Sequence, residues 1–271
     1  MVVPRIYYNP AENTIGGFLS NDGTIEFCNR INALLQPDFT VLDLGAGRGS
    51  WYTDECEYRK DLRRIKGKVK EYVCADIDEA VLSNPTSDKN LVICDNRVPL
   101  EDHSIDLILS DYVLEHVVDV ESFKSEITRL LKPGGYFCAR TPHAMHYVSV
   151  FARVIRNPMH VRVLRFLQPR REARDVFPTA YKLNSLRRVR NEFPGWINYS
   201  YIHSSDPQYF FGSRTLYRLF RILHAVLPRS TTGNVFIFLK NGQKKAALAE
   251  LTAVKPQSTL PTPRLNVQKA G

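Results

Sequence analysis

The sequence lacks any long apolar run. No stretch of its 271 residues approaches the ~18 consecutive apolar residues that a membrane-spanning helix needs. The N-terminal stretch M-V-V-P-R-I-Y-Y-N-P also lacks the charged start and continuous apolar block of a secretory signal. We therefore expect a cytoplasmic protein, with a peripheral position at the inner face of the membrane as the alternative.

Cysteine is sparse, and its spacing is not typical of a disulfide framework or a metal site. The five cysteines form no C-x-x-C pair, and three of them lie in apolar, strand-like runs where a thiol behaves as a small hydrophobic side chain. This pattern indicates a reducing compartment. It predicts neither a disulfide framework nor a metal site.

Acidic residues are scarce in one part of the chain. Overall, 37 Lys and Arg stand against 28 Asp and Glu, a net charge of +9. Between Phe151 and Lys240 there are 16 basic and 4 acidic residues, so that region alone carries +12. Such a concentration of positive charge raises the question of an anionic partner.

What the sequence does have is a series of short apolar runs that alternate with helical patterns. The runs predict strands over residues 39–44, 71–75, 90–94, 105–110 and 136–140, and the helical patterns cover residues 23–35 and 120–131. Strands that alternate with helices indicate βαβ units and a parallel sheet. The charged residues 57–70 predict a solvated helix or a long loop.

Four acids stand at the ends of these predicted strands, at Asp43, Asp76, Asp95 and Asp111. Each lies at the carboxyl end of its strand. Open α/β sheets bind their ligands at that edge. We therefore expect the four carboxylates to converge on one cleft.

The later part of the chain predicts further elements: helices over 182–193 and 213–227, and strands over 196–202 and 234–239. Residues 143–183 hold basic amphipathic runs and predict a helical lid, inserted after the fifth strand and over the cleft mouth. We expect residues 1–241 to form a single domain that includes this lid. Residues 242–271 show no core pattern and predict a disordered tail.

The stretch V-L-D-L-G-A-G-R-G, residues 41–49, joins the first predicted strand to a glycine loop. The dinucleotide fingerprint is G-x-G-x-x-G, with the pyrophosphate at a helix N-terminus. Here the third glycine arrives one residue early, and a pyrophosphate would lie close to the Asp43 carboxylate. Both features disfavour a nicotinamide-dependent oxidoreductase, as does the absence of a Y-x-x-x-K pair.

S-adenosylmethionine avoids this conflict because it has no phosphate and carries an ammonium and a sulfonium. Glycines let the backbone approach its methionine and ribose, and Asp43 can face the ammonium directly or through water. Asp76 is placed for the two ribose hydroxyls. Asp95 or the amide of Asn96 can meet the exocyclic amine of adenine.

Four motifs occur in order: V-L-D-L-G-A-G-R-G, V-C-A-D-I-D, I-C-D-N-R-V-P-L-E-D-H-S-I-D-L-I-L-S-D-Y-V-L-E-H-V and L-L-K-P-G-G-Y-F. Together they closely resemble class I S-adenosylmethionine-dependent methyltransferases, specifically the small-molecule methyltransferase type 11 group. The resemblance is strong over residues 25–142 and looser out to residue 240. It implies an α/β fold with a Rossmann-like, mostly parallel seven-stranded sheet, helices on both faces and an antiparallel last strand.

The same resemblance implies where the cofactor binds. Asp43, Gly45 and Gly47 match the methionine loop, and Asp111 matches the post-strand position that lines the cofactor. The full expected cofactor-binding set is Asp43, Gly45, Ala46, Gly47, Asp76, Ile77, Asp95, Asn96 and Asp111. The chain departs from the family in its long charged segment 52–70. The region after residue 143 resembles uncharacterised bacterial members.

A catalytic base matters only if the acceptor is a hydroxyl, whose proton must leave. His116, His143 and His146 lie near the predicted cleft, as does Tyr112. Histidine is the natural candidate because its ordinary pKa lies near neutral pH. We take His116, His143 and Tyr112 as the candidates. Each could equally be a packing or loop residue.

The sequence thus predicts a methyltransferase that acts on a small-molecule or glycan acceptor, possibly anionic in character and methylated on oxygen. The basic region 143–190 could be a solvated lid, a site for an anionic acceptor or a surface for peripheral membrane contact. Nucleic acid is disfavoured because no D/N-P-P-Y-type signature follows the fourth strand. A catalytically silent cofactor-binding scaffold or an RNA-associated protein is the alternative.

Overall fold

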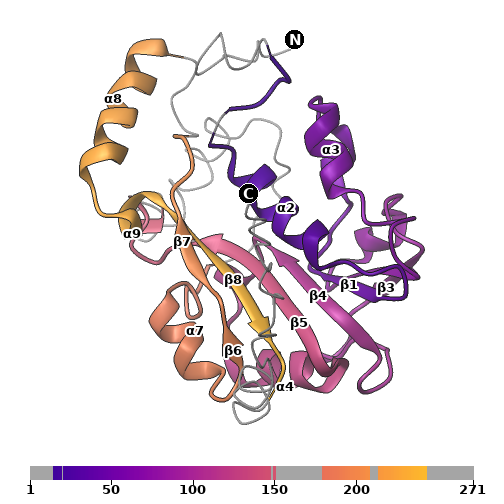
Figure 1. Ribbon diagram of the computed structural model, residues 1–271. Helices are drawn as coiled ribbons and strands as arrows, with labels where there is room; N and C mark the ends of the chain where they lie inside the picture. Colours follow the sequence, from indigo (N-terminus) through magenta and orange to yellow (C-terminus); the bar gives the residue numbers. More distant parts are fainter. Residues whose placement is uncertain (1–14, 20, 148, 151–178, 208–212, 243–271) are drawn as a thin grey trace, which may run out of the picture.

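A computed structural model describes residues 15–19, 21–147, 149–150, 179–207 and 213–242 (Figure 1). One mixed sheet runs through them in the order β3-β2-β1-β4-β5-β8-β6, and β7 also pairs with β8. The strands are β1 (Thr40–Leu44), β2 (Glu71–Asp76), β3 (Lys89–Val92), β4 (Ile105–Asp111), β5 (Leu131–Pro142), β6 (Ile197–Asn198), β7 (Tyr201–His203) and β8 (Asn234–Lys240).

The sheet confirms the expected fold class. Strands β1 to β5 pair in parallel, and β8 pairs antiparallel with β5. The strand order reverses between β1 and β4, which are neighbours although two strands separate them in the chain. In open α/β sheets this reversal marks the place where ligands bind.

The far edge of the sheet is one strand position divided in two. Strands β6 and β7 lie one after the other along the same side of β8, opposite Leu239–Lys240 and Asn234–Phe236. Between them the Ser200 hydroxyl, in place of a backbone carbonyl, accepts a hydrogen bond from the Phe238 N–H at 3.2 Å. The sequence predicted a single strand here, and the sheet therefore has seven positions filled by eight strands.

Strand β5 begins earlier than the sequence predicted. Leu131 pairs with Ile105, and the next pair joins Tyr136 to Leu107, so the segment K-P-G-G bulges out of the ladder. Gly134 adopts a φ of 79° in this bulge, and its N–H donates to the Asn241 carbonyl at 2.6 Å. Helix α4 ends at Leu130 and β5 begins at the next residue, so the K-P-G-G segment lies inside β5.

The helices begin at polar caps. Asp22 accepts from the N–H groups of Thr24 and Ile25, and Asp119, Ser185 and Ser213 cap later helices in the same way. The helices are α2 (Gly23–Leu34), α3 (Glu57–Arg63), α4 (Val120–Leu130), α7 (Leu186–Glu192), α8 (Arg214–Val226) and α9 (Arg229–Thr232), with 3-10 turns η1 (Ser50–Thr53), η2 (Glu79–Ser83) and η3 (Leu114–His116). Helix α7 is shorter than predicted because Ser185 caps it. Every described helix is too short or too polar to cross a bilayer.

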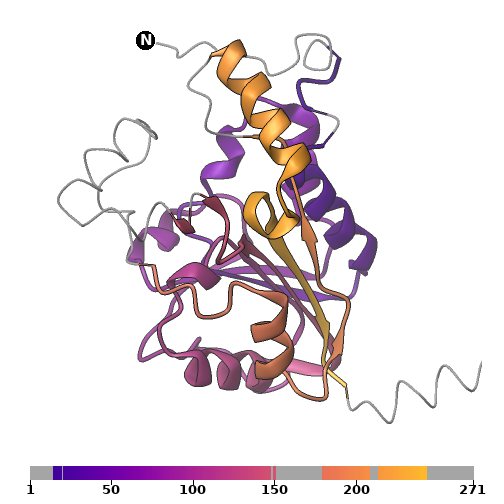
Figure 2. The same ribbon diagram turned by 90° about the vertical axis from the view of Figure 1, so that its left-hand side faces the viewer.

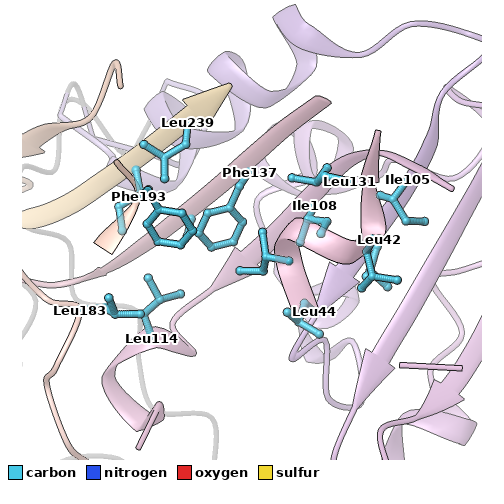
Figure 3. Close-up of a cluster of buried hydrophobic side chains, with 14 of the residues drawn as sticks. Leu42, Leu44, Ile105, Ile108, Leu114, Leu131, Phe137, Leu183, Phe193 and Leu239 are labelled. Atoms are coloured by element: carbon cyan, nitrogen blue, oxygen red, sulfur yellow. The ribbon is translucent and has the colours of Figure 1, made fainter. Parts of the chain in front are cut away.

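Side-chain alternation divides the core between the two faces of the sheet. Leu42 and Leu44 of β1 pack with residues of α4, β4 and β5 on one face, where Phe137 lies at the centre (Figure 3). Val41 points to the other face and packs with Phe27 and Ile31 of α2. Figure 2 shows α2 on one side of the sheet and α4 with α7 on the other. Asp43 follows Val41 by two residues and therefore points into the α2 side.

Truncation of Phe137 tests this core. Its side chain is fully buried. Phe137→Ala should lower the free energy of unfolding by about 3–5 kcal/mol, since it removes a buried ring and leaves a cavity. Urea unfolding followed by circular dichroism measures the loss. The matched control is Leu82→Ala at a residue that is 59% exposed, with an expected change within ~0.5 kcal/mol. Equal effects of the two substitutions would contradict the assignment of this core.

Candidate functional site

The candidate site lies at the carboxyl ends of the parallel strands, the end above which α3 and α8 rise on opposite sides in Figure 1. The loop after β1 enters it, and the ends of β2 and β4 flank that loop because both strands pair with β1. The predicted site residues therefore come from adjacent strands.

The glycine loop needs glycine. Gly45, Gly47 and Gly49 have φ values of 85°, 51° and 66°, in the left-handed region that other residues rarely adopt. A Cβ atom on Gly45 would lie only 2.2 Å from Cγ2 of Val113, in the loop after β4. The loop therefore packs closely on the end of β4, and only a residue without a side chain fits at Gly45.

Most N–H groups of the glycine loop donate hydrogen bonds to other atoms of the protein. Those of Gly45 and Ala46 donate to the Ala75 carbonyl at 2.7 and 3.2 Å, and that of Gly49 donates to the Ala46 carbonyl. The N–H of Gly47 donates to the Asp76 carboxylate at 2.8 Å. A phosphate-binding loop presents such groups to its ligand. The loop after β1 does not leave its N–H groups open for a phosphate, and it places the Asp76 carboxylate beside them.

Asp76 holds the centre of the site. Its second oxygen accepts from the N–H of Asp78 at 3.0 Å, so backbone donors fix both oxygens of the carboxylate. Each oxygen keeps acceptor capacity, and the side chain is only half-buried. Ile77 follows it and is 61% exposed, as expected of an apolar residue that could cover a flat ring. A fixed carboxylate of this kind suits a ligand with two adjacent hydroxyls.

Asp43 is buried under the loop. The Tyr72 hydroxyl donates to its Oδ2 at 2.7 Å. Burial raises the pKa of Asp43 to about 7, although the hydrogen bond from Tyr72 opposes the shift, and the negative charge of Asp111 adds to it. A cation brought near this carboxyl would stabilise its charged form, whereas an anion would be repelled.

Asp95 and Asn96 form a tight turn beyond β3. Both have positive φ values, 51° and 59°, and the flanking residues Cys94 and Arg97 exchange two backbone hydrogen bonds. These are the features of a type I′ turn, in which Asn and Asp are favoured. Both residues are exposed at the site's edge. The turn alone accounts for their residue types, and their contact with a ligand stays a prediction.

Asp111 is engaged by two guanidinium groups. Arg140 donates to it through Nε and Nη2, and Arg63 of α3 donates through Nη2 at 3.1 Å. Burial would raise the pKa of Asp111, but these charges hold it below its ordinary value. Arg140 also donates to the Thr24 hydroxyl at 2.9 Å. The cluster clamps α2 and α3 to the ends of β4 and β5, which favours a positioning role for Asp111 over a direct ligand contact.

The three predicted base candidates occupy different surroundings. Tyr112 has a positive φ of 59°, and its hydroxyl accepts from the Asn234 amide at 3.1 Å. The Arg140 guanidinium lies over its ring, 4.8 Å from the centroid. His116 is half-buried at the end of η3, close to the loop because its N–H bonds the Val113 carbonyl. Tyr112 thus lies at the clamp, and His116 lies beside the glycine loop.

His143 is engaged through one ring nitrogen. Its Nδ1 accepts from the N–H of Met145 at 3.0 Å. Burial lowers the pKa of His143. The ring is therefore neutral near pH 7, but its acceptor nitrogen is already occupied. This arrangement favours a structural role for His143.

Sequence reasoning missed a second set of polar side chains at this edge. Among the described residues, three buried polar atoms lack a hydrogen-bond partner and come from the same region: His203 Nε2, Ser205 Oγ and His224 Nε2. A Cβ atom on Gly23 would lie 2.2 Å from the Ser205 hydroxyl and 3.4 Å from His203 Cδ2, so both pack on the start of α2. The His224 ring contacts the Ser205 carbonyl at 3.2 Å. We call these three residues the His203 cluster.

The residues of the site fit S-adenosylmethionine better than a dinucleotide. The N–H groups of the glycine loop already donate within the protein, and the carboxyls of Asp43 and Asp76 flank the loop. These groups suit an ammonium and a ribose, whereas the two carboxyls would repel a pyrophosphate. Within the described residues, no three side chains of metal-ligating type come together. The predicted lid, residues 143–183, lies largely outside the described residues, as does the predicted tail.

Asp43→Asn tests the buried carboxyl, because it keeps the shape of the side chain and an acceptor for Tyr72. Between about pH 4 and about pH 7 the folded state holds a proton that an unfolded Asp has lost. Wild-type stability should therefore fall across that window as the pH rises, by up to about 4 kcal/mol relative to the variant. Urea unfolding at several pH values measures it, and parallel pH profiles for the two proteins would contradict the raised pKa.

A family model described as a methyltransferase domain matches residues 42–139. A Mycolicibacterium smegmatis protein assigned as an S-adenosylmethionine-dependent methyltransferase is 33% identical over 132 residues. That match covers 46% of this chain and 46% of the relative, so it spans about half the length of each.

Two solved structures share the fold. One is a chain of the complex between the Haloferax volcanii Trm112 methyltransferase activator and a methyltransferase, with a TM-score of 0.51 and 16% identity over 80% of this chain and 89% of that one. The other is a Galdieria sulphuraria protein assigned as a sarcosine dimethylglycine methyltransferase, with a TM-score of 0.50 and 17% identity over 82% and 85%. Residues 42–139 are thus similar in sequence to a methyltransferase domain, and the chain shares the fold of these two solved structures.

Proposed function

We propose that the protein transfers the methyl group of S-adenosylmethionine to an oxygen of a small-molecule or glycan acceptor. The observation that carries the proposal is the Asp76 carboxylate, which accepts the Gly47 N–H at 2.8 Å and so fixes an acid beside the glycine loop. The match of residues 42–139 to a methyltransferase domain supports it.

In this proposal the residues at the ends of β1, β2 and β3 would hold the cofactor. Asp76 would accept from the ribose hydroxyls, and Ile77 and the Asp95–Asn96 turn would contact the adenine. Gly45, Gly47 and Asp43 would hold the methionine end. A carboxyl whose pKa is about 7 can hold the charge of an ammonium at that position.

The cofactor supplies an electrophilic methyl group on its sulfonium. Transfer is then a matter of proximity and alignment, so the main task of the protein is to hold an acceptor oxygen in line. Tyr112 and the Arg63–Asp111–Arg140 clamp lie on the acceptor side, past the end of β4. They give that side a rigid polar wall.

We assign the proton-accepting role to His203. Its Nε2 is buried and has no partner among the described residues, and burial lowers the pKa of its ring so that the imidazole is neutral near pH 7. His203 pairs in register with Asn234, the residue that bonds the Tyr112 hydroxyl. A hydroxyl acceptor placed between Tyr112 and His203 could give its proton to the His203 ring.

The acceptor could also be anionic, and the basic region 143–190 could contact it or a membrane surface. Residues 151–178 of this region lie outside the described residues. The excess of basic over acidic residues in this region supports such a contact.

Asp76→Asn tests the cofactor assignment. Loss of the charged acceptor for the ribose hydroxyls should weaken binding of S-adenosylmethionine by roughly 10- to 100-fold in calorimetry. The control is Asp119→Asn, which alters an acid that accepts from the Ser122 N–H at the start of α4 and, within the described part of the chain, has no bond to the loop. Its affinity should match that of the wild type. Unchanged binding by the Asp76 variant would rule out the ribose contact.

His203→Asn tests the acceptor side once a substrate is known. It should lower kcat by about 10²–10⁴-fold and remove the fall in kcat at acidic pH that comes from protonation of the ring. His224→Asn is the matched control and should keep that acidic limb. A His203 variant with the wild-type pH profile would exclude the residue as a base.

The function itself is tested with methyl-labelled cofactor and fractionated extract of the source organism. The proposal predicts label on a small molecule or glycan, released by conditions that cleave an ether or ester. Cofactor binding without transfer to any fraction would favour a silent scaffold. Label on nucleic acid, with binding that weakens steeply with salt, would favour an RNA-associated role.

A further inference from the structure

Helix α8 has two apolar faces, and one of them is open to solvent. Tyr217 is buried, whereas Leu219, Ile222 and Val226 are 61%, 63% and 73% exposed. These three residues follow a spacing of three and four, so they form one stripe along the helix. We call them the α8 stripe.

The opposite face of α8 holds the helix to the protein. Phe220 stacks on Tyr147 with ring centroids 5.8 Å apart, and His224 meets the same ring edge-on at 5.7 Å. The His224 ring also contacts the Ser205 carbonyl. The helix is therefore fixed by one face while the α8 stripe points away.

The charge around the stripe is of one sign. Residues 213–233 contain four Arg and no Asp or Glu. Arg218 and Arg221 are exposed and lie to one side of the stripe at helical spacing. An exposed apolar stripe bordered by Arg is the pattern of a helix that lies in the surface of an anionic membrane, with its guanidinium groups among the headgroups.

We propose that α8 docks the protein on an anionic lipid bilayer through the α8 stripe. A second copy of the chain fits less well: three aliphatic side chains expose far less than the ~800 Å² per partner of a stable interface, and the two arginine-rich helices would repel each other. Lipid satisfies both the apolar stripe and the positive charge.

Docking would also place the proposed acceptor side near the bilayer. Helix α8 carries His224 of the His203 cluster, whose ring contacts the Ser205 carbonyl. The helix also rises at the carboxyl ends of the strands (Figure 1). Resting on the proposed function, this points to an acceptor that is itself held at the membrane. The docking step does not depend on that function, because it uses no residue of the cofactor site.

Co-sedimentation with vesicles tests the docking. The full chain should bind vesicles of phosphatidylcholine with phosphatidylglycerol and should bind phosphatidylcholine alone weakly. Leu219→Ser with Ile222→Ser should weaken partitioning by roughly a hundredfold. Arg218→Gln with Arg221→Gln should weaken it about 25-fold, and added salt should weaken the wild type.

The matched control is Leu82→Ser with Val118→Ser, two apolar residues of similar exposure on other elements. It should bind vesicles like the wild type. If circular dichroism shows that the double Ser variant does not fold, the vesicle binding of the Arg218→Gln, Arg221→Gln variant tests the proposal in its place. No vesicle binding, equal binding to neutral vesicles, or concentration-dependent dimers that the stripe variant abolishes would overturn the proposal. Calorimetry with S-adenosylmethionine separates this failure from a failure of the cofactor assignment.

Discussion

The hydrogen bond from the Gly47 N–H to the Asp76 carboxylate is the contact on which the site depends. It ties the loop after β1 to the end of β2, and it turns a chain segment with three left-handed glycines into a fixed surface. The same bond occupies the Gly47 N–H, so this part of the loop presents the Asp76 carboxylate to a ligand and no free donor. We therefore expect the loop to favour a ligand with hydroxyls and positive charge over one with phosphates.

Around this contact the protein manages several buried charges in different ways. Asp111 stays ionised because Arg140 and Arg63 surround it, and in return the ion pairs join two helices to the sheet. Asp43 accepts from a tyrosine hydroxyl and, among the described residues, forms no ion pair. A clamp that is already neutralised can hold the acceptor side rigid, whereas an acid whose pKa is about 7 can respond to an incoming cation.

The sequence predicted the sheet, the glycine loop and the two strand-end acids Asp43 and Asp76 because each depends on local pattern and on one fold-level rule. His203 follows directly after the strand predicted over 196–202, but the sequence did not show that this strand ends at the same edge of the sheet, where β7 ends. No pattern could show that Arg140 and Arg63 engage Asp111, since α3 and β5 meet only in the folded chain. The type I′ turn at Asp95 was missed because its dipeptide is not the usual Asn-Gly.

We expect the glycine loop to bind S-adenosylmethionine and not a dinucleotide. The most direct measurement is a pair of calorimetric titrations of the wild-type chain, one with S-adenosylmethionine and one with NAD. The expected result is saturable binding of S-adenosylmethionine at one site and no heat from NAD, whose pyrophosphate would meet the Asp76 and Asp43 carboxyls. Binding of NAD, with no heat from S-adenosylmethionine, would contradict it.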